Sequence, residues 1–306
     1  MEIGYEDLDD DLLAEVEKFE QEETKGLTAS ELPANLAKII RPREIRIKND
    51  VTHTVNKING IDVVFPFEPY EVQIKYMSHI LEAIDSGKNA LLESPTGTGK
   101  TMGLLCASLA WLRKNRQEEL QNFDPSSVPN QYKIVYTSRT HSQLSQVIRE
   151  LNNSVYRPEV CVLGSRDVMC VNPNLNGTHG PILSANCKKL RRDRMCKYHE
   201  HLKNATMVGN DAVDIEDLTK LGRDYNFCPF YMQRNKLKSG QADIIFVPYN
   251  YILEAPIRKA IGLELKNSIL IIDEAHNVEK VAEDASSFNL TCSDLEKCEL
   301  EAEAII

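Results

Sequence analysis

Apolar residues recur along the chain in two alternating patterns. Short runs rich in β-branched and aromatic residues are typical of buried strands, and longer stretches with helical spacing separate them. Helices are expected over residues 71–86, 101–116 and 141–152. Strands that alternate with helices predict an α/β fold, in which a parallel sheet is covered on both faces. The strands are expected at residues 61–65, 89–93, 133–137, 160–163, 243–247 and 268–272.

Two parts of the chain break this alternation. Residues 1–58 read as an acidic arm followed by a polar linker, expected to be disordered, with a partner-binding amphipathic helix in the arm as the alternative. Residues 166–240 are rich in Cys, Asn, Lys and Arg and predict an irregular or helical module inserted into the sheet domain. The sheet domain then comprises residues 59–165 and 241–280, and residues 281–306 follow it.

The charge distribution leaves a binding surface for nucleic acid open. The formal net charge is −10, and residues 1–35 hold twelve acids against two lysines, so the arm carries the whole excess. A neutral body can still carry a local basic groove. We expect no secretory signal, and no apolar run approaches the ~20 residues that a membrane span needs. The eight cysteines are therefore expected as metal ligands, catalytic groups or buried residues in a reducing compartment.

One glycine-rich segment has the context of a phosphate-binding loop, because it follows an expected strand and opens an expected helix. Its backbone N–H groups and the helix N-terminus favour a phosphate, whereas a chance glycine-rich turn is the alternative. Lys100 is expected to reach the β- and γ-phosphates of ATP, and the Thr101 hydroxyl to hold Mg²⁺. The loop comprises Ser94, Pro95, Thr96, Gly97, Thr98, Gly99, Lys100 and Thr101.

A second carboxylate site follows the apolar run at residues 269–272. Asp273 falls at the carboxyl end of a parallel strand, where ligands bind in such folds, and is expected to hold Mg²⁺. Glu274 is expected to orient or deprotonate an attacking water, and His276 to link nucleotide state to a second motor half. A helix cap is the alternative for Asp273 and Glu274 if this segment is taken alone.

The insert carries four cysteines and a basic stretch. Cys170, Cys187, Cys196 and Cys228 are separated by 16, 8 and 31 residues, without the Cys-x-x-Cys pairs of a zinc ribbon. Spacing alone leaves a [4Fe–4S] cluster, a zinc site and plain burial open. The basic residues suit a phosphate backbone, with a solvated face as the alternative. They are Lys188, Lys189, Arg191, Arg192, Arg194 and Lys197.

The combination of these motifs resembles the XPD-type iron–sulfur helicases of superfamily 2. The resemblance rests on the phosphate loop, on Asp273-Glu274-Ala275-His276 and on cysteines inserted between them, and it covers about residues 60–290. It implies a RecA-like motor domain, and a [4Fe–4S] cluster held by the four cysteines of the insert. It also implies adenine recognition by Gln73 beside Tyr70.

The same resemblance implies contacts to DNA. Residues 138–141 match a family motif that binds the DNA backbone, which assigns this role to Arg139, Thr140 and His141. The insert is expected to touch single-stranded DNA near the point of strand separation.

The resemblance favours an ATP-dependent 5′→3′ DNA helicase. It is expected in the nucleus, acting on single-stranded and branched DNA in repair, recombination and telomere maintenance. A protein partner for the acidic arm is a further expectation, and no membrane partner is expected. Residues 281–306 are expected to begin an arch insertion, with the second motor domain missing, as in a fragment or short isoform. The alternatives are an ATP- and DNA-binding half-motor without turnover and a zinc-bearing nucleic-acid adaptor.

Overall fold

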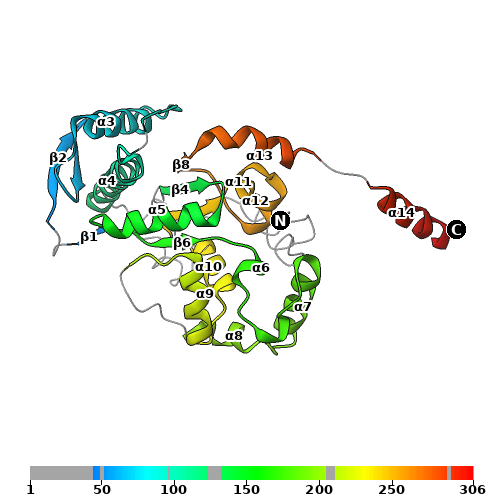
Figure 1. Ribbon diagram of the computed structural model, residues 1–306. Coiled ribbons are helices and arrows are strands. Elements are labelled where there is room, and N and C mark those ends of the chain that lie inside the picture. Colours follow the sequence, from blue (N-terminus) through cyan, green and yellow to red (C-terminus); the bar gives the residue numbers. More distant parts are fainter. Residues whose placement is uncertain are drawn as a thin grey trace.

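The computed structural model describes residues 44–48, 52–95, 97–122, 132–204, 211–287 and 291–305. At its centre lies a parallel four-stranded sheet with the strand order β6-β7-β4-β8 (Figure 1). The predicted α/β fold class with a parallel sheet is therefore confirmed. The strands are β6 (Val160–Val162), β7 (Ile244–Pro248), β4 (Lys133–Ser138) and β8 (Ser268–Ile272).

Alternate residues of the central strands enter two separate cores. Tyr136 and Phe246 belong to the larger apolar cluster, whereas Val135 and Ile245 belong to a second one. This follows from the two-residue period of a strand, which sends successive side chains to opposite faces. Both faces of the sheet are therefore covered, as the apolar runs predicted. The larger cluster includes α3 (Glu71–Asp85), α4 (Lys100–Gln121) and α5 (His141–Asn153), and the second includes α11 (Asn250–Leu253) and α12 (Ala255–Ile261).

Two polar contacts fix α4, the helix that follows the glycine-rich loop. The Trp111 Nε1–H donates to Asp85 Oδ1 on α3 at 2.6 Å. Arg116 forms a buried ion pair with Asp243, next to β7, at 2.8 Å between Nη1 and Oδ1. A buried pair of this geometry is costly to break, because either partner alone would be a desolvated charge. The helix is thus tied both to α3 and to the sheet.

The predicted disorder of residues 1–58 is wrong for part of the linker. Strand β2 (Thr54–Ile58) pairs with β3 (Ile61–Phe65) as a hairpin, and β1 (Arg46–Ile47) pairs with β5 (Tyr156–Arg157). The turn Asn59-Gly60 has φ values of 48° and 77°, and Asn-Gly is a favoured pair in two-residue hairpin turns. The acidic arm lies outside the described residues.

The expected strand at residues 89–93 does not form. A strand needs a neighbour to satisfy its backbone, and among the described residues no strand pairs with this segment. Leu91 is 93% exposed as a result. Strand β8 accordingly lies at an edge of the sheet, where Leu270 and Ile272 are each 39% exposed rather than buried as expected.

The insert between β6 and β7 is helical. Its α10 is held to the sheet by Gln233, whose Oε1 accepts from the Val162 N–H at 3.0 Å. Cys161 donates its thiol to the Gln233 carbonyl at 3.4 Å, and Cys161 and Cys106 are buried in the core, as predicted. The insert contains α6 (Arg166–Met169), η3 (Pro173–Leu175), α7 (Gly180–Arg192), α8 (Lys197–Glu200), η4 (His201–Asn204), α9 (Ile215–Asp224) and α10 (Pro229–Lys238).

After β8 the chain continues in helices. They are η5 (Ala275–Asn277), α13 (Val278–Ala285) and α14 (Cys292–Ile305). Among the helices that the structure describes, none is long and apolar enough to cross a membrane.

Candidate nucleotide and metal sites

The glycine-rich loop has the backbone that phosphate binding requires. Helix α4 begins at Lys100, directly after Gly99, and Gly97 and Gly99 have φ values of 79° and 73°. A Cβ added at Gly99 would lie 2.5 Å from Gln73 Nε2, so both the conformation and the space exclude larger residues. The N–H groups at the start of α4 have no partner within the helix and form an anion site. Thr96, predicted in this loop, lies outside the described residues.

The loop is closed on itself by its own side chains. Lys100 Nζ donates to the Ser94 carbonyl at 2.8 Å, and the Ser94 and Thr98 hydroxyls lie 2.8 Å apart. The Thr98 hydroxyl also donates to the Pro95 carbonyl at 2.9 Å. The ammonium therefore lies against the loop backbone, where a phosphate oxygen can replace the Ser94 carbonyl as its acceptor. Thr101 is half-buried in the first turn of α4.

Gln73 connects the start of α3 to the same loop. Its Nε2 donates to the Thr98 carbonyl at 3.0 Å, and its Oε1 accepts from the Tyr70 N–H at 3.0 Å. Gln73 is buried, whereas Tyr70 is 71% exposed at the N-terminus of α3. Both residues lie beside the phosphate loop, and adenine recognition by them stays a prediction.

Asp273 extends from the end of β8 toward the same site. Its N–H donates to the Thr137 carbonyl at 2.9 Å, and its Oδ2 accepts from the Tyr136 hydroxyl at 3.0 Å. Burial raises the pKa of Asp273, while the Tyr136 hydrogen bond and the positive charge of Lys100 act in the opposite direction. Since Lys100 acts on this carboxylate, the phosphate loop and the strand end face one site. Tyr136 was expected only as a strand residue.

A chain of exposed polar contacts runs from Glu274 to Arg139. Glu274 adopts the left-handed backbone region with φ 53°, and its Oε2 lies 3.4 Å from His276 Nδ1. Asn277 Nδ2 lies 3.0 Å from His276 Nε2, and Arg139 Nη1 donates to Asn277 Oδ1 at 3.5 Å. The expected catalytic carboxylate is thereby linked to an expected DNA contact.

The other two expected DNA contacts in this motif have local roles. The Thr140 hydroxyl accepts from the Gln143 N–H at 3.3 Å and caps α5. Burial lowers the pKa of His141, so the imidazole is neutral at physiological pH. Among these three residues, Arg139 is the one that offers a positive charge to a phosphate.

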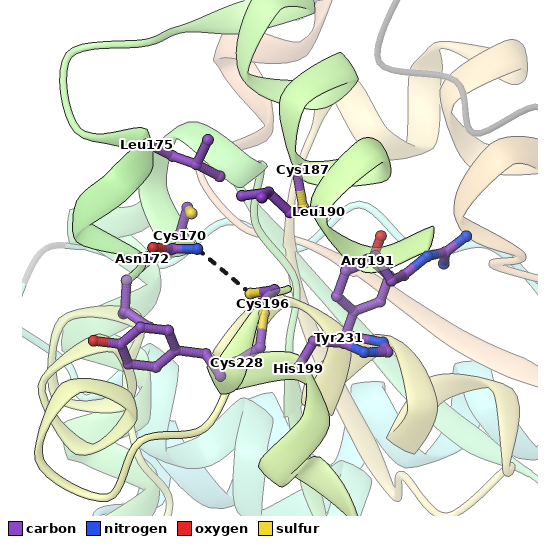
Figure 2. A pocket seen from close by; sticks show the side chains of 12 residues that line it. Cys170, Asn172, Leu175, Cys187, Leu190, Arg191, Cys196, His199, Cys228 and Tyr231 are labelled. Atoms are coloured by element: carbon purple, nitrogen blue, oxygen red, sulfur yellow. Dashed lines mark hydrogen bonds between the residues drawn. The ribbon is translucent and has the colours of Figure 1, made fainter. Parts of the chain in front are cut away.

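The four cysteines of the insert line one small cavity, although they come from different elements (Figure 2). Cys170 follows α6, and Cys187 lies on α7. Cys196 and Cys228 stand immediately before α8 and α10. The apolar wall includes Leu175 and Leu190 beside the sulfur atoms (Figure 2). The fold thus brings together all four cysteines that the sequence analysis selected.

The surroundings of the cavity contain donors that favour thiolates. Burial raises the pKa of Cys170, Cys187 and Cys228, the last to about 12. Against this effect, the positive charge of Arg166 lowers the pKa of Cys170 and Cys187. Arg166 is 3% exposed, and its guanidinium lies 4.4 Å from the centroid of the Phe230 ring. Asn172 Nδ2 donates to Cys196 Sγ at 3.5 Å (dashed in Figure 2).

The cavity fits a sulfur-ligated group by its donor set. Its volume is about 20 Å³, enough for about one water molecule, so assembly of a cluster requires the walls to move outward. Within the described ranges, no three His, Cys, Asp or Glu side chains lie close enough together to hold a metal ion. The four sulfur atoms are therefore spread around the cavity more widely than a single ion needs.

The basic stretch of the insert divides into two faces. Lys189, Arg192 and Arg194 are exposed at and after the end of α7. Arg191 instead lines the cysteine cavity and lies 5.2 Å from the centroid of the Tyr231 ring (Figure 2). Lys188 is half-buried. The exposed residues form the part of the stretch that is available to a nucleic acid.

Comparison with known proteins gives relatives of one kind. The chain is 42% identical over 269 residues to the human "Regulator of telomere elongation helicase 1", covering 78% of this chain and 22% of that protein. It is 43% identical over 274 residues to the Arabidopsis thaliana "Regulator of telomere elongation helicase 1 homolog", covering 81% of this chain and 26% of the relative. The chain thus spans about a fifth to a quarter of the length of these relatives.

Among solved structures, "XPD_Helicase" matches with a TM-score of 0.47 and 25% identity, covering 71% of this chain and 34% of that one. The DEAD_2 family model matches residues 136–295, which include β4, the cysteine cavity and the Asp273-Glu274-Ala275-His276 segment. The chain belongs to the DEAD_2 family.

Proposed function

We propose that this chain binds ATP·Mg²⁺ as the front part of an ATP-dependent DNA helicase. The observation that carries the proposal is the phosphate loop at the start of α4, facing an Asp273 carboxylate on which the charge of Lys100 acts. Lys100 and the α4 N-terminus would bind the β- and γ-phosphates. Thr101 and Asp273 would hold Mg²⁺, and Glu274 would orient the attacking water.

The cysteine cavity would hold a [4Fe–4S] cluster through Cys170, Cys187, Cys196 and Cys228. The wide arrangement of the four sulfur atoms favours a cluster over a single zinc ion, whose four ligands lie at about 2.3 Å from one centre. When bound, the cluster would cross-link the helices of the insert. Arg166 would then compensate part of the negative charge of the thiolates.

Single-stranded DNA is the proposed nucleic acid. Arg139 at the sheet and the exposed Lys189, Arg192 and Arg194 of the insert supply positive charge for phosphates. The link from Arg139 through Asn277 and His276 to Glu274 gives DNA a route to the catalytic carboxylate. The relatives' printed names support helicase activity linked to telomeres, and we extend the proposal to 5′→3′ unwinding in nuclear DNA repair and recombination.

An ATPase assay with and without single-stranded DNA tests this proposal. DNA-stimulated hydrolysis that disappears in Lys100→Ala is the result expected of a motor. A half-motor that binds without turnover is the second candidate, because the chain spans only 22% of the human relative. It predicts binding of an ATP analogue without hydrolysis, whereas failure to bind nucleotide contradicts both readings.

A further inference from the structure

The hydroxyl of Tyr136 is a buried polar group in the middle of the sheet. Tyr136 lies on β4, paired with Phe246 on β7 and Ile271 on β8, and its side chain is 0% exposed. A phenylalanine would fill nearly the same volume, so packing alone does not explain the hydroxyl. Burying a hydroxyl is costly unless it is hydrogen-bonded. Its acceptor is Asp273 Oδ2, at 3.0 Å.

The contacts of Asp273 hold the whole carboxylate in one orientation. Oδ2 accepts from Tyr136, and Oδ1 accepts from the Glu274 N–H at 3.1 Å. The backbone is fixed as well, because the Asp273 N–H donates to the Thr137 carbonyl and its carbonyl accepts from the Tyr249 hydroxyl. Each carboxylate oxygen has two lone pairs, so each retains capacity for Mg²⁺ or for a water bound to it.

We propose that Tyr136 is a positioning residue, which fixes the Asp273 carboxylate in the orientation that Mg²⁺ binding needs. The inference rests on the proposed function and deepens it, since it assigns the metal-binding geometry to a residue in the core. The Tyr136 ring is held 5.6 Å from the Phe246 ring, between two neighbouring strands, and therefore acts as a rigid anchor. A ligand that is already ordered does not lose conformational freedom when the ion binds.

Tyr136→Phe tests the proposal, because it keeps the ring and removes the donor. Binding of a fluorescent ATP analogue to the chain is measured at increasing Mg²⁺ concentrations. We expect the half-saturating Mg²⁺ concentration to rise about tenfold, the effect of losing one hydrogen bond to a charged group. Nucleotide affinity at saturating Mg²⁺ should stay within about twofold of that of the unchanged chain, because Lys100 and the loop are intact.

Tyr156→Phe is the matched control. Tyr156 is also 0% exposed, but its hydroxyl accepts from the Val64 N–H at 2.9 Å. Both variants lose one buried hydrogen bond, so both should lower the melting temperature by similar amounts. Only Tyr136→Phe should change the Mg²⁺ requirement, and a merely structural role would make the two variants alike.

A double-mutant cycle supplies a second readout. In an Asp273→Asn background, Tyr136→Phe should cause no further change in the Mg²⁺ requirement. Thermal unfolding without nucleotide should likewise show coupling between the two positions. An equal or lower Mg²⁺ requirement in Tyr136→Phe overturns the inference alone. Absence of nucleotide binding by the unchanged chain overturns the proposed function and this inference together.

Discussion

The phosphate loop and the cysteine cavity differ in how the chain assembles them. The loop consists of neighbouring residues, and its conformation follows from two glycines and the start of one helix. The cavity takes its four cysteines from different elements, separated by 16, 8 and 31 residues. A local site depends mainly on its own backbone, whereas a site of distant residues depends on the packing of the whole module. The two sites should therefore respond differently to substitution.

The largest effect is expected from Cys228→Ser. Loss of one ligand should reduce iron in anaerobically purified protein from about four atoms per chain to nearly none. Binding of an ATP analogue should persist, because the loop lies outside the insert. Cys292→Ser is the control, since Cys292 is exposed on α14, and it should keep its iron. Stoichiometric zinc in the unchanged protein would contradict the cluster.

Lys100→Ala should have the opposite pattern. We expect nucleotide affinity to fall about a hundredfold, because losing one partner of a desolvated charge pair costs about 2–5 kcal/mol. Iron content should be unchanged. Lys88→Ala, at an exposed position before the loop, is the control. Titration with a fluorescent ATP analogue gives both affinities, and equal affinities for the two variants would refute the assignment of the loop.

Gly222→Ala should damage the cysteine module through packing alone. An added Cβ would lie 2.5 Å from Pro229 Cγ and 3.0 Å from the Phe227 carbonyl oxygen, directly beside Cys228. We expect a loss of about 1–3 kcal/mol in stability, the usual cost of overpacking, together with reduced iron. Gly103→Ala on α4 is the control, because its Cβ would meet Tyr76 at an ordinary 3.5 Å. Thermal unfolding of the two variants decides, and equal stability would exclude tight packing at Gly222.

The smallest effect concerns DNA. Reversing Lys189 and Arg192 to Glu should flatten the salt dependence of single-strand binding by about one to one and a half units, at ~0.7 per phosphate. Reversing Lys220 and Arg223 on α9 makes the same change in charge at exposed positions elsewhere in the insert. Affinity is measured at several salt concentrations in samples of equal iron content. Equal changes in both double variants would show a general charge effect rather than a binding face.

Both sites could be selected from the sequence, but their contacts could not. Lys100 and Asp273 belong to short motifs whose local backbone is set by neighbouring residues, so each was found without the fold. The Tyr136–Asp273 hydrogen bond joins two strands that are far apart in the sequence, and no local pattern contains it. The position of Arg191 against Tyr231 likewise depends on how α7 packs on α10.

Errors in the predicted fold have the same origin. The segment at residues 89–93 has the composition of a strand, but pairing with another strand decides whether it forms one. The β2–β3 hairpin was missed although Asn59-Gly60 was a local signal, since the polar residues around it resembled a linker. Cys170 and Cys228 needed the folded insert to show that they meet.

Calorimetric titration of the anaerobically purified chain with a non-hydrolysable ATP analogue, with and without Mg²⁺, tests the central claim most directly. The account predicts binding of about one nucleotide per chain, strengthened by Mg²⁺ because the ion bridges the phosphates to Thr101 and Asp273. Absence of binding in both conditions, or binding that Mg²⁺ leaves unchanged, would contradict a nucleotide site formed by the phosphate loop and Asp273.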